Sequence, residues 1–588
     1  MENKKSSGQW RRQYAVLFII ICSCFLLLLP VASFSQYTRY WIQFTDKNNN
    51  PNTISNPSTY LSTRAIKRRQ NQGIAILQND LPVTPAYIDS VQKIPNVSLL
   101  NRSKWFNAIT IYTKDTNAIN KIKTFPFVLK TKPVQKYSRK ETDMERNENP
   151  FFDSNSKFEI PGSKTQAINS KTHQASSPYN YGPSYNQINM VGGVCMHDSG
   201  FHGEGMVIAI LDAGFYNANV LTVFDSLRAN KQILGTWDFV DNDTMVYDSH
   251  QHGSWVLSLM GGNLPGKIVG TAPKAKFWLL RTEQAATEYV IEEDNWVSAA
   301  EFADSAGADI LSTSLGYTTF DSLKVDSVTH IVNPDNHSYA DMNGNVAHIS
   351  IGTDIAVSKG MFAVCSAGNS GWSPWHYIGA PADADSVLAV GAVDSSGKYA
   401  GFSSTGPSFD RRVKPDVAAQ GDNPIITDLD TGVYRLSGTS FSCPITAGMV
   451  ACLWQSHPSA TTRQLFDAII RTASHYSIPD SLTGYGIPDF CQASYILSVA
   501  DNPSAKDVIK VFPNPFSSVV SVSLEGLRIQ NPDVKIKLYD VVGREVKLYG
   551  MKKNLHSIEL DCRNLSDGVY ILNLASSGRN YSAKLIKH

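Results

Sequence analysis

The sequence predicts an α/β protein whose central domain is a parallel β-sheet with helices on both faces. Short apolar runs alternate there with stretches of helical periodicity. Strands in a parallel sheet need crossover connections, and these are usually helices, so such alternation is typical of a doubly covered sheet. We expect this domain over residues 180–499. The runs are residues 207–211, 276–280, 310–312, 361–365 and 387–390.

Two smaller domains are expected on either side of the central one. Residues 36–135 combine strand-like runs at 40–44 and 108–112 with a helix-like segment at 85–91, which favours a small α+β domain. A basic stretch, RAIKRR, lies at residues 64–69.

Residues 508–588 change to alternation of apolar and polar residues. This period of two, at 520–524, 534–538 and 570–574, indicates half-buried strands. Turn signals separate these strands, so we predict a β-sandwich.

The amino terminus has the pattern of a secretory signal peptide. Four basic residues precede an apolar run at 14–29, and small residues follow at 32–35. The run is shorter than the ~20 residues of a spanning helix, which disfavours the alternative of a membrane anchor. We predict a signal peptide at 1–35 and, from its Lys-, Asn- and Ser-rich composition, a linker at 136–179.

Charge and cysteine content exclude several classes of protein. With 53 basic and 52 acidic residues the net charge is +1, so no overall field attracts nucleic acid. Six cysteines lie outside the predicted signal peptide, and their spacings form no dense disulfide framework. Cys365 and Cys443 are expected to be small buried hydrophobic side chains.

Three segments carry the residue types of nucleophilic serine chemistry, which needs a hydroxyl, an imidazole base and a carboxylate. Asp212 ends the run at 207–211, so it should lie at the carboxyl edge of the sheet, where α/β proteins bind ligands. His252 begins a segment of helical apolar spacing. Ser440 lies in GTSFSCP at 438–444, at an expected helix start with Pro444 in the first turn.

The order Asp, His, Ser distinguishes families that share this chemistry. Alpha/beta hydrolases run Ser, acid, His, and chymotrypsin-like enzymes run His, Asp, Ser. The order in this chain resembles that of the subtilisin-like serine peptidases, the subtilases. A fourth motif, SAGN at 366–369, resembles their oxyanion loop. The resemblance implies that Asn369 and the Ser440 amide stabilise the oxyanion, and that Ser314, Leu315 and Gly316 pair with extended substrate.

The flanking domains resemble known partners of such enzymes. Subtilases carry an inhibitory propeptide ahead of the catalytic domain, which implies that role for residues 36–135. Residues 508–588 resemble the carboxyl-terminal sorting domain of type IX secretion, through FPNP at 512–515 and the ending KLIK at 584–587. This implies export through the periplasm to the extracellular space or cell surface, with the outer-membrane secretion machinery as a partner and membrane contact only in transit.

Together these features predict a secreted serine endopeptidase that acts on proteins or peptides as a monomer. A catalytically silent surface binding protein on the same fold and an esterase using the same three residues are the alternatives. The chemistry requires no cofactor. Calcium is an open expectation at Asp238, Asp241 and Asp243, or at the loop 341–345, which lacks the later glutamate of an EF-hand.

Overall fold

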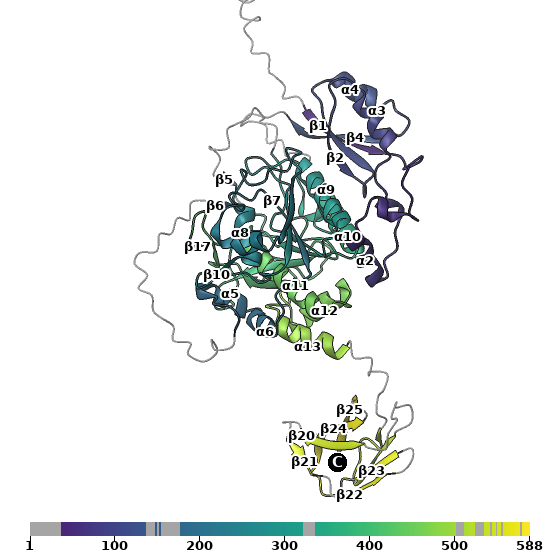
Figure 1. The fold of residues 1–588 in the computed structure, drawn as a ribbon, viewed down its shortest axis with the longest axis vertical. Helices are drawn as coiled ribbons and strands as arrows, with labels where there is room; N and C mark the ends of the chain where they lie inside the picture. The colour runs from purple at the N-terminus through teal and green to yellow at the C-terminus, as the bar shows by residue number, and fades with distance from the viewer. Residues whose placement is uncertain are drawn as a thin grey trace, which may run out of the picture.

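The computed structural model describes residues 37–136, 148–149, 152–153, 177–321, 335–500, 511–523, 534–540, 544–547, 550–553, 557–576 and 579–588. The predicted signal peptide at 1–35 lies outside the described residues, and so does most of the predicted linker. We refer to residues 37–136 as the amino-terminal domain, 177–500 as the central domain and 511–588 as the carboxyl-terminal domain (Figure 1).

A seven-stranded sheet, parallel throughout, forms the middle of the central domain (Figure 1). Strand β7, which ends in Asp212, lies inside the sheet between β12 and β11. In spatial order the strands are β15 (Val417–Gln420), β14 (Leu388–Val393), β13 (Phe362–Ser366), β12 (Ile310–Thr313), β7 (Val207–Asp212), β11 (Lys276–Arg281) and β8 (Ile233–Asp238).

Helices cover both faces of this sheet, as predicted. Helices α8 (His252–Gly261) and α11 (Thr439–Ser456) pack together on one face. Helices α9 (Ile291–Ala306) and α10 (His348–Ser358) pack together on the other. Each face has its own apolar core, because the strands are buried on both sides. The other described α-helices of this domain are α5 (Tyr185–Asn189), α6 (Gly193–Asp198), α7 (Asp225–Ala229), α12 (Thr462–Thr472) and α13 (Phe490–Ala500).

The five predicted strands are present, and two further strands, β8 and β15, extend the sheet at its edges. Strand β8 is only partly buried and contains Gly235 and Thr236, which weakens its apolar signal. Strand β15 reads VAAQ, too short and alanine-rich to be distinguished from helix. The remaining strand pairs of this domain are β9 (Asn263–Leu264) with β10 (Ile268–Val269), and β16 (Ile425–Thr427) with β17 (Val433–Arg435).

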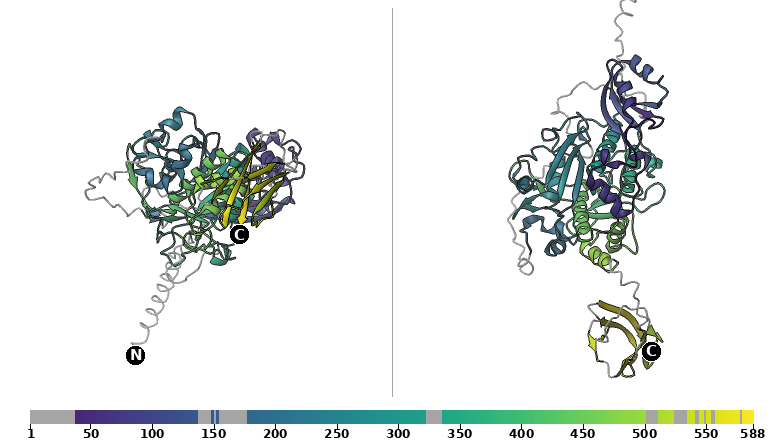
Figure 2. Two further views of the ribbon diagram at one scale, coloured as in Figure 1. Left: turned by 90° about the horizontal axis from the view of Figure 1, so that it is seen from below. Right: turned by 45° about the vertical axis from the view of Figure 1, so that its right-hand side comes forward.

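The amino-terminal domain is a four-stranded antiparallel sheet with helices, which confirms the α+β prediction. Its strand order is β2 (Ser98–Ser103), β3 (Ala108–Tyr112), β1 (Tyr37–Phe44) and β4 (Val128–Lys136). Strand β2 packs on α9, and Trp41 and Trp105 join the core on that face of the central sheet. Figure 2 shows this domain in purple along one side of the central domain. Its helices are α2 (Thr63–Gln72), α3 (Pro85–Gln92) and α4 (Thr116–Ile122).

The carboxyl-terminal domain contains two four-stranded sheets around one apolar core. Leucine and isoleucine side chains from both sheets meet in this core, as expected for a sandwich. One sheet has the order β18 (Val511–Phe512), β19 (Val519–Ser523), β23 (Ser557–Asp561) and β22 (Gly550–Lys553). The other has β21 (Glu545–Val546), β20 (Lys535–Asp540), β24 (Gly568–Ser576) and β25 (Arg579–Lys587).

A disulfide between Cys195 and Cys491 joins α6 to α13, two helices 296 positions apart in the sequence. The sequence pattern alone did not predict this pair. Cys365 and Cys443 are buried thiols, as expected. Among the described helices, none combines the length and apolarity needed to cross a bilayer.

Replacing Cys195 and Cys491 together with serine should destabilise the central domain by about 2 to 5 kcal/mol, because the bridge constrains a very long loop of the unfolded chain. Urea unfolding monitored by tryptophan fluorescence measures this. Reduction of the unaltered protein is the matched control and should give the same shift. An unchanged midpoint in both samples would contradict a structural role for the bridge.

Candidate active site

The carboxyl end of β7 and the start of α8 bring two of the predicted catalytic residues into contact. His252 Nδ1 lies 2.7 Å from Asp212 Oδ1, which also accepts a hydrogen bond from the Ala213 amide at 2.8 Å. Both side chains are buried. A proton on Nδ1 satisfies the carboxylate, so the ring presents Nε2 as its basic nitrogen.

Glycines allow this close approach of helix and strand. A Cβ at Gly253 would lie 2.3 Å from the carbonyl oxygen of Gly214. Gly214 itself has a φ of 146°, in the region that favours glycine. The Gly253 amide donates to the Gly214 carbonyl at 2.9 Å. This contact requires glycine directly after His252, whereas the neighbouring His250 is followed by Gln251.

Ser440 lies in the first turn of α11 and is tied to the predicted substrate-binding segment. Its hydroxyl donates to the Ser314 carbonyl at 3.1 Å, and the Ser314 hydroxyl donates to the Ser440 carbonyl at 3.0 Å. The ring of the next residue, Phe441, lies 6.2 Å from that of His252, so the turn that carries Ser440 lies near the imidazole. The structure therefore brings Asp212, His252, Ser440 and Ser314 to one edge of the sheet.

Pro444 lies in the second turn of α11 and not in the first, which corrects the sequence prediction. The helix begins one residue before Ser440, so proline occupies its sixth position. There it removes the amide that would otherwise bond to the carbonyl four residues earlier, that of Ser440. The Ser440 carbonyl therefore receives no hydrogen bond from residue 444 and accepts one from the Ser314 hydroxyl instead.

Asn369 lies beside the same turn. Its Oδ1 accepts hydrogen bonds from the Thr439 amide and hydroxyl, both at 2.9 Å. Because Oδ1 is held by Thr439, the orientation of the amide group is fixed, and Nδ2 is the end that can donate. The loop is anchored further by the Gly368 amide, which donates to the Thr439 hydroxyl at 3.2 Å.

The other predicted candidates have different surroundings. Burial and the adjacent His252 lower the pKa of His250 to about 4. Arg281 forms ion pairs with Asp238 at 2.6 Å and Asp241 at 2.8 Å, so the protein supplies a cation there itself. The Asp341 carboxylate accepts from the amide and hydroxyl of Ser338. Calcium at either place stays a prediction.

A cluster of carboxylates that sequence reasoning missed borders the site. One oxygen each of Glu283, Glu288 and Glu292 lies within 4.8 Å of the others, and of the described residues this group could hold a metal ion. The Tyr317 hydroxyl, one residue beyond the predicted substrate segment, donates to Glu283 at 3.0 Å. Burial, together with the charge of Asp212, raises the pKa of Glu283 to about 8. Three glutamates within ten residues were the available sequence signal.

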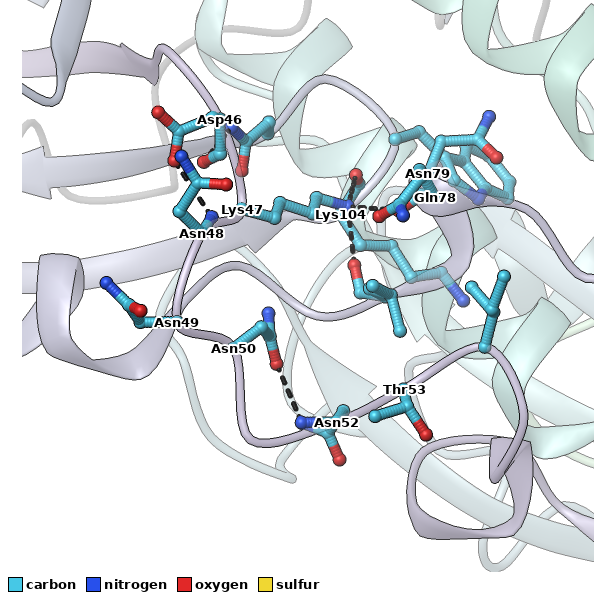
Figure 3. A pocket seen from close by; sticks show the side chains of 14 residues that line it. Asp46, Lys47, Asn48, Asn49, Asn50, Asn52, Thr53, Gln78, Asn79 and Lys104 are labelled. Carbon is cyan, nitrogen blue, oxygen red and sulfur yellow. Dashed lines mark hydrogen bonds between the residues drawn. The ribbon is translucent and has the colours of Figure 1, made fainter.

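A polar cavity of about 690 Å³ lies in the amino-terminal domain, away from these residues (Figure 3). Lys47 crosses it and donates to the carbonyls of Gln78, Leu81 and Lys104 at 3.1, 2.5 and 2.7 Å. Burial lowers the pKa of Lys47 to about 8. The lysine therefore ties the loops of this domain together.

Comparison with known families agrees with this arrangement. Residues 203–486 match the model of the subtilase family. Residues 203–486 are a subtilase domain. The matched range includes Asp212, His252 and Ser440, and the match supports a serine protease.

The flanking domains match families of their own. Residues 39–149 match the peptidase S8 propeptide domain of Bacteroidota, and residues 510–588 match a secretion system carboxyl-terminal sorting domain. The subtilase domain thus follows a propeptide and precedes a sorting domain. The sorting domain indicates type IX secretion to the extracellular space or the cell surface.

Relatives of the subtilase domain include several subtilisins. Subtilisin E of Bacillus subtilis (strain 168) is 28% identical over 292 residues, which are 49% of this chain and 65% of that protein. Subtilisin of Bacillus pumilus is 27% identical over 292 residues, covering 49% of this chain and 90% of that one. The chain thus spans about two thirds of the length of subtilisin E.

Among solved structures, MycP1 from Mycobacterium smegmatis has 22% identity and a TM-score of 0.39. The alignment covers 54% of this chain and 86% of that one.

Glu283→Gln should make the stability of the subtilase domain less sensitive to pH. The folded protein keeps a proton on Glu283 up to about pH 8, whereas the unfolded chain releases it near pH 4.5. Between these values the folded state binds the extra proton, so its stability falls as the pH rises. Glutamine cannot ionise, so the variant should gain thermal stability relative to the parent from pH 5 to pH 9.

Thermal unfolding across that range measures the difference. Asp430→Asn, on an exposed turn of the same domain, is the control and should leave the pH profile unchanged. Parallel profiles for the parent and Glu283→Gln would contradict burial of a protonated Glu283.

Proposed function

We propose that the chain is a secreted serine endopeptidase that hydrolyses peptide bonds through an acyl-enzyme, with Ser440 as nucleophile, His252 as base and Asp212 as the orienting carboxylate. The observation that carries the proposal is the buried 2.7 Å contact of His252 Nδ1 with Asp212, beside the turn that holds Ser440. The subtilase match and the subtilisin relatives support it.

In the proposed reaction, Ser440 attacks the substrate carbonyl while His252 Nε2 takes the hydroxyl proton. For this step the hydroxyl must turn away from the Ser314 carbonyl, to which it donates in the present structure. His252 then gives the proton to the leaving amine, and water repeats the sequence to release the acid. Asp212 keeps Nδ1 protonated and stabilises the imidazolium without accepting its proton.

The developing oxyanion would be stabilised by the Asn369 side-chain amide and the Ser440 backbone amide. Both come from segments that are already fixed, because Thr439 holds Asn369 and the helix holds Ser440. Donors fixed before the reaction need no reorganisation as the charge forms. The amino end of α11 adds the positive end of its helix dipole.

Substrate would bind as an extended strand along Ser314, Leu315 and Gly316. These residues follow directly after β12, at the same edge as the proposed nucleophile. Main-chain hydrogen bonding of this kind accepts many sequences, which suits protein and peptide substrates. We further propose that the enzyme acts as a monomer and that the sorting domain is recognised by the outer-membrane secretion machinery.

Labelling with a serine-directed phosphonate tests the proposal. The matured protein should be labelled at Ser440, and Ser440→Ala should abolish both labelling and casein cleavage. Ser442→Ala, two residues along the same helix, is the matched control and should still be labelled. Labelling without peptide cleavage would favour an esterase, and absence of labelling would favour the silent binding protein.

Asn369→Ala should lower kcat by roughly 10²–10³-fold with little change in KM, because the lost donor acts on the transition state. Thr439→Ser is the control, since it keeps the hydroxyl that donates to Asn369 Oδ1. Steady-state kinetics on a peptide substrate give both constants. A loss in KM alone would instead assign Asn369 to substrate binding.

A further inference from the structure

The basic stretch at residues 64–69 has no role in the proposed chemistry, yet its arginines make specific contacts with the subtilase domain. They lie on α2, next to the carboxyl ends of α9 and α10 (Figure 1). Carbonyl groups at a helix carboxyl end have no partner within the helix, and that end carries a partial negative charge. Cationic donors are the natural complement of such ends.

Arg68 contacts both helix ends. It donates to the carbonyls of Ala308 and Asp304 near the end of α9, and to the carbonyl of Lys359, just after α10. It also pairs with the Asp304 carboxylate at 2.5 Å. The side chain is almost fully buried. One guanidinium group therefore satisfies several polar groups at once, which its fork of donors permits.

Two neighbouring side chains of α2 extend this contact. Arg64 donates to the Gly307 carbonyl at 2.9 Å and pairs with Asp309. Gln72 donates to the Gly360 carbonyl at 2.8 Å and accepts from the Thr462 amide at 3.2 Å. Arg64 and Gln72 thus donate to carbonyl groups that follow α9 and α10, as Arg68 does.

Asp304 is the centre of the charged part of the interface. This fully buried carboxylate lies near the carboxyl end of α9, where the helix dipole disfavours an anion. In the described part of the chain, its ion-pair partners are Arg68, Arg69 and Lys104, all from the amino-terminal domain. Burial alone would raise the pKa of Asp304, but these three cations lower it.

The cationic side is held in place by its own contacts. Arg69 also pairs with Asp80 at 2.8 Å, and Asp80 pairs with Lys359 of the subtilase domain at 3.1 Å. Lys47, which crosses the cavity of Figure 3, holds the carbonyl of Lys104 and those of the turn at 78–81. The amino-terminal domain therefore presents its cations in a fixed arrangement.

This interface lies at the opposite edge of the sheet from Ser440. Asp309 directly precedes β12, and Lys359 and Gly360 shortly precede β13, so the arginines meet the amino edge. Asp212 and Ser314 mark the carboxyl edge. A contact at the amino edge is on the far side of the sheet from Ser440. It therefore affects how tightly the amino-terminal domain is bound and does not touch the reacting atoms.

We propose that the carboxyl ends of α9 and α10, with Asp304 and Asp309, form a docking site for guanidinium groups whose ligand is the arginine face of α2. This site retains the amino-terminal domain after the chain between the two domains has been cut. The site selects arginine over lysine, because an ammonium group cannot reach the carbonyls of Ala308 and Lys359 and the Asp304 carboxylate together.

The test uses the full chain with Ser440→Ala and a site-specific protease sequence inserted within residues 137–176. After folding and cleavage at the insert, gel filtration and a competitor chase measure how fast the amino-terminal domain dissociates. Arg68→Ala should raise the dissociation rate at least 100-fold, and Arg68→Lys at least 10-fold. Lys67→Ala, an exposed cation on the same helix, should change it less than twofold.

Equal rates for Arg68→Ala and Lys67→Ala would overturn the proposal, since general charge would then explain the contact. If Arg68→Ala does not fold, Asp304→Asn tests the same pair from the other side with little change of shape and should also dissociate at least 10-fold faster. Hydrogen exchange on the unaltered pair adds a measurement without any variant at the interface. Loss of protection in the last turn of α9 while the cut domains still co-elute would likewise overturn the proposal.

Discussion

The active-site arrangement depends on how closely the start of α8 approaches the end of β7. A buried carboxylate at a strand end can hold an imidazole only if the helix that carries the imidazole lies directly against that strand. Gly214 and Gly253 provide this, since a side chain at either position would meet backbone or ring atoms. The 2.7 Å contact of Asp212 with His252 follows from this packing, and the position of α11 beside α8 follows in turn.

The amino-terminal domain packs against the opposite face of the same sheet and completes its core. Trp41 and Trp105 contribute to the core on the α9 and α10 face of the sheet, and Glu301 of α9 accepts hydrogen bonds from Ser103, Lys104 and Trp105. The face of the subtilase domain that carries α9 is therefore completed by another domain. Buried polar groups on α9 find partners there that the subtilase domain does not supply.

Sequence reasoning was most successful where the signal is local. The strand that ends at Asp212 is a continuous apolar run before its last residue, the motifs at 252–253 and 438–444 mark helix starts, and the motif at 366–369 follows directly from a strand. It failed where the deciding partner is distant. Arg68 and Arg69 of α2 are buried and pair with Asp304, more than 230 positions away, and the pairing of Cys195 with Cys491 has no local signature. Strands β8 and β15 were missed because edge position and small side chains weaken periodicity.

The covalent link between α6 and α13 has a consequence for maturation. It joins α6, near the start of the central domain, to α13, its last helix, close to the points where the neighbouring domains are attached. Trimming of the polypeptide on either side leaves these two ends clasped, so fraying cannot spread from a fresh terminus into the sheet. Disulfides persist in the oxidising environment outside the cell, so the bridge would keep the scaffold closed there even if the flanking chain were trimmed.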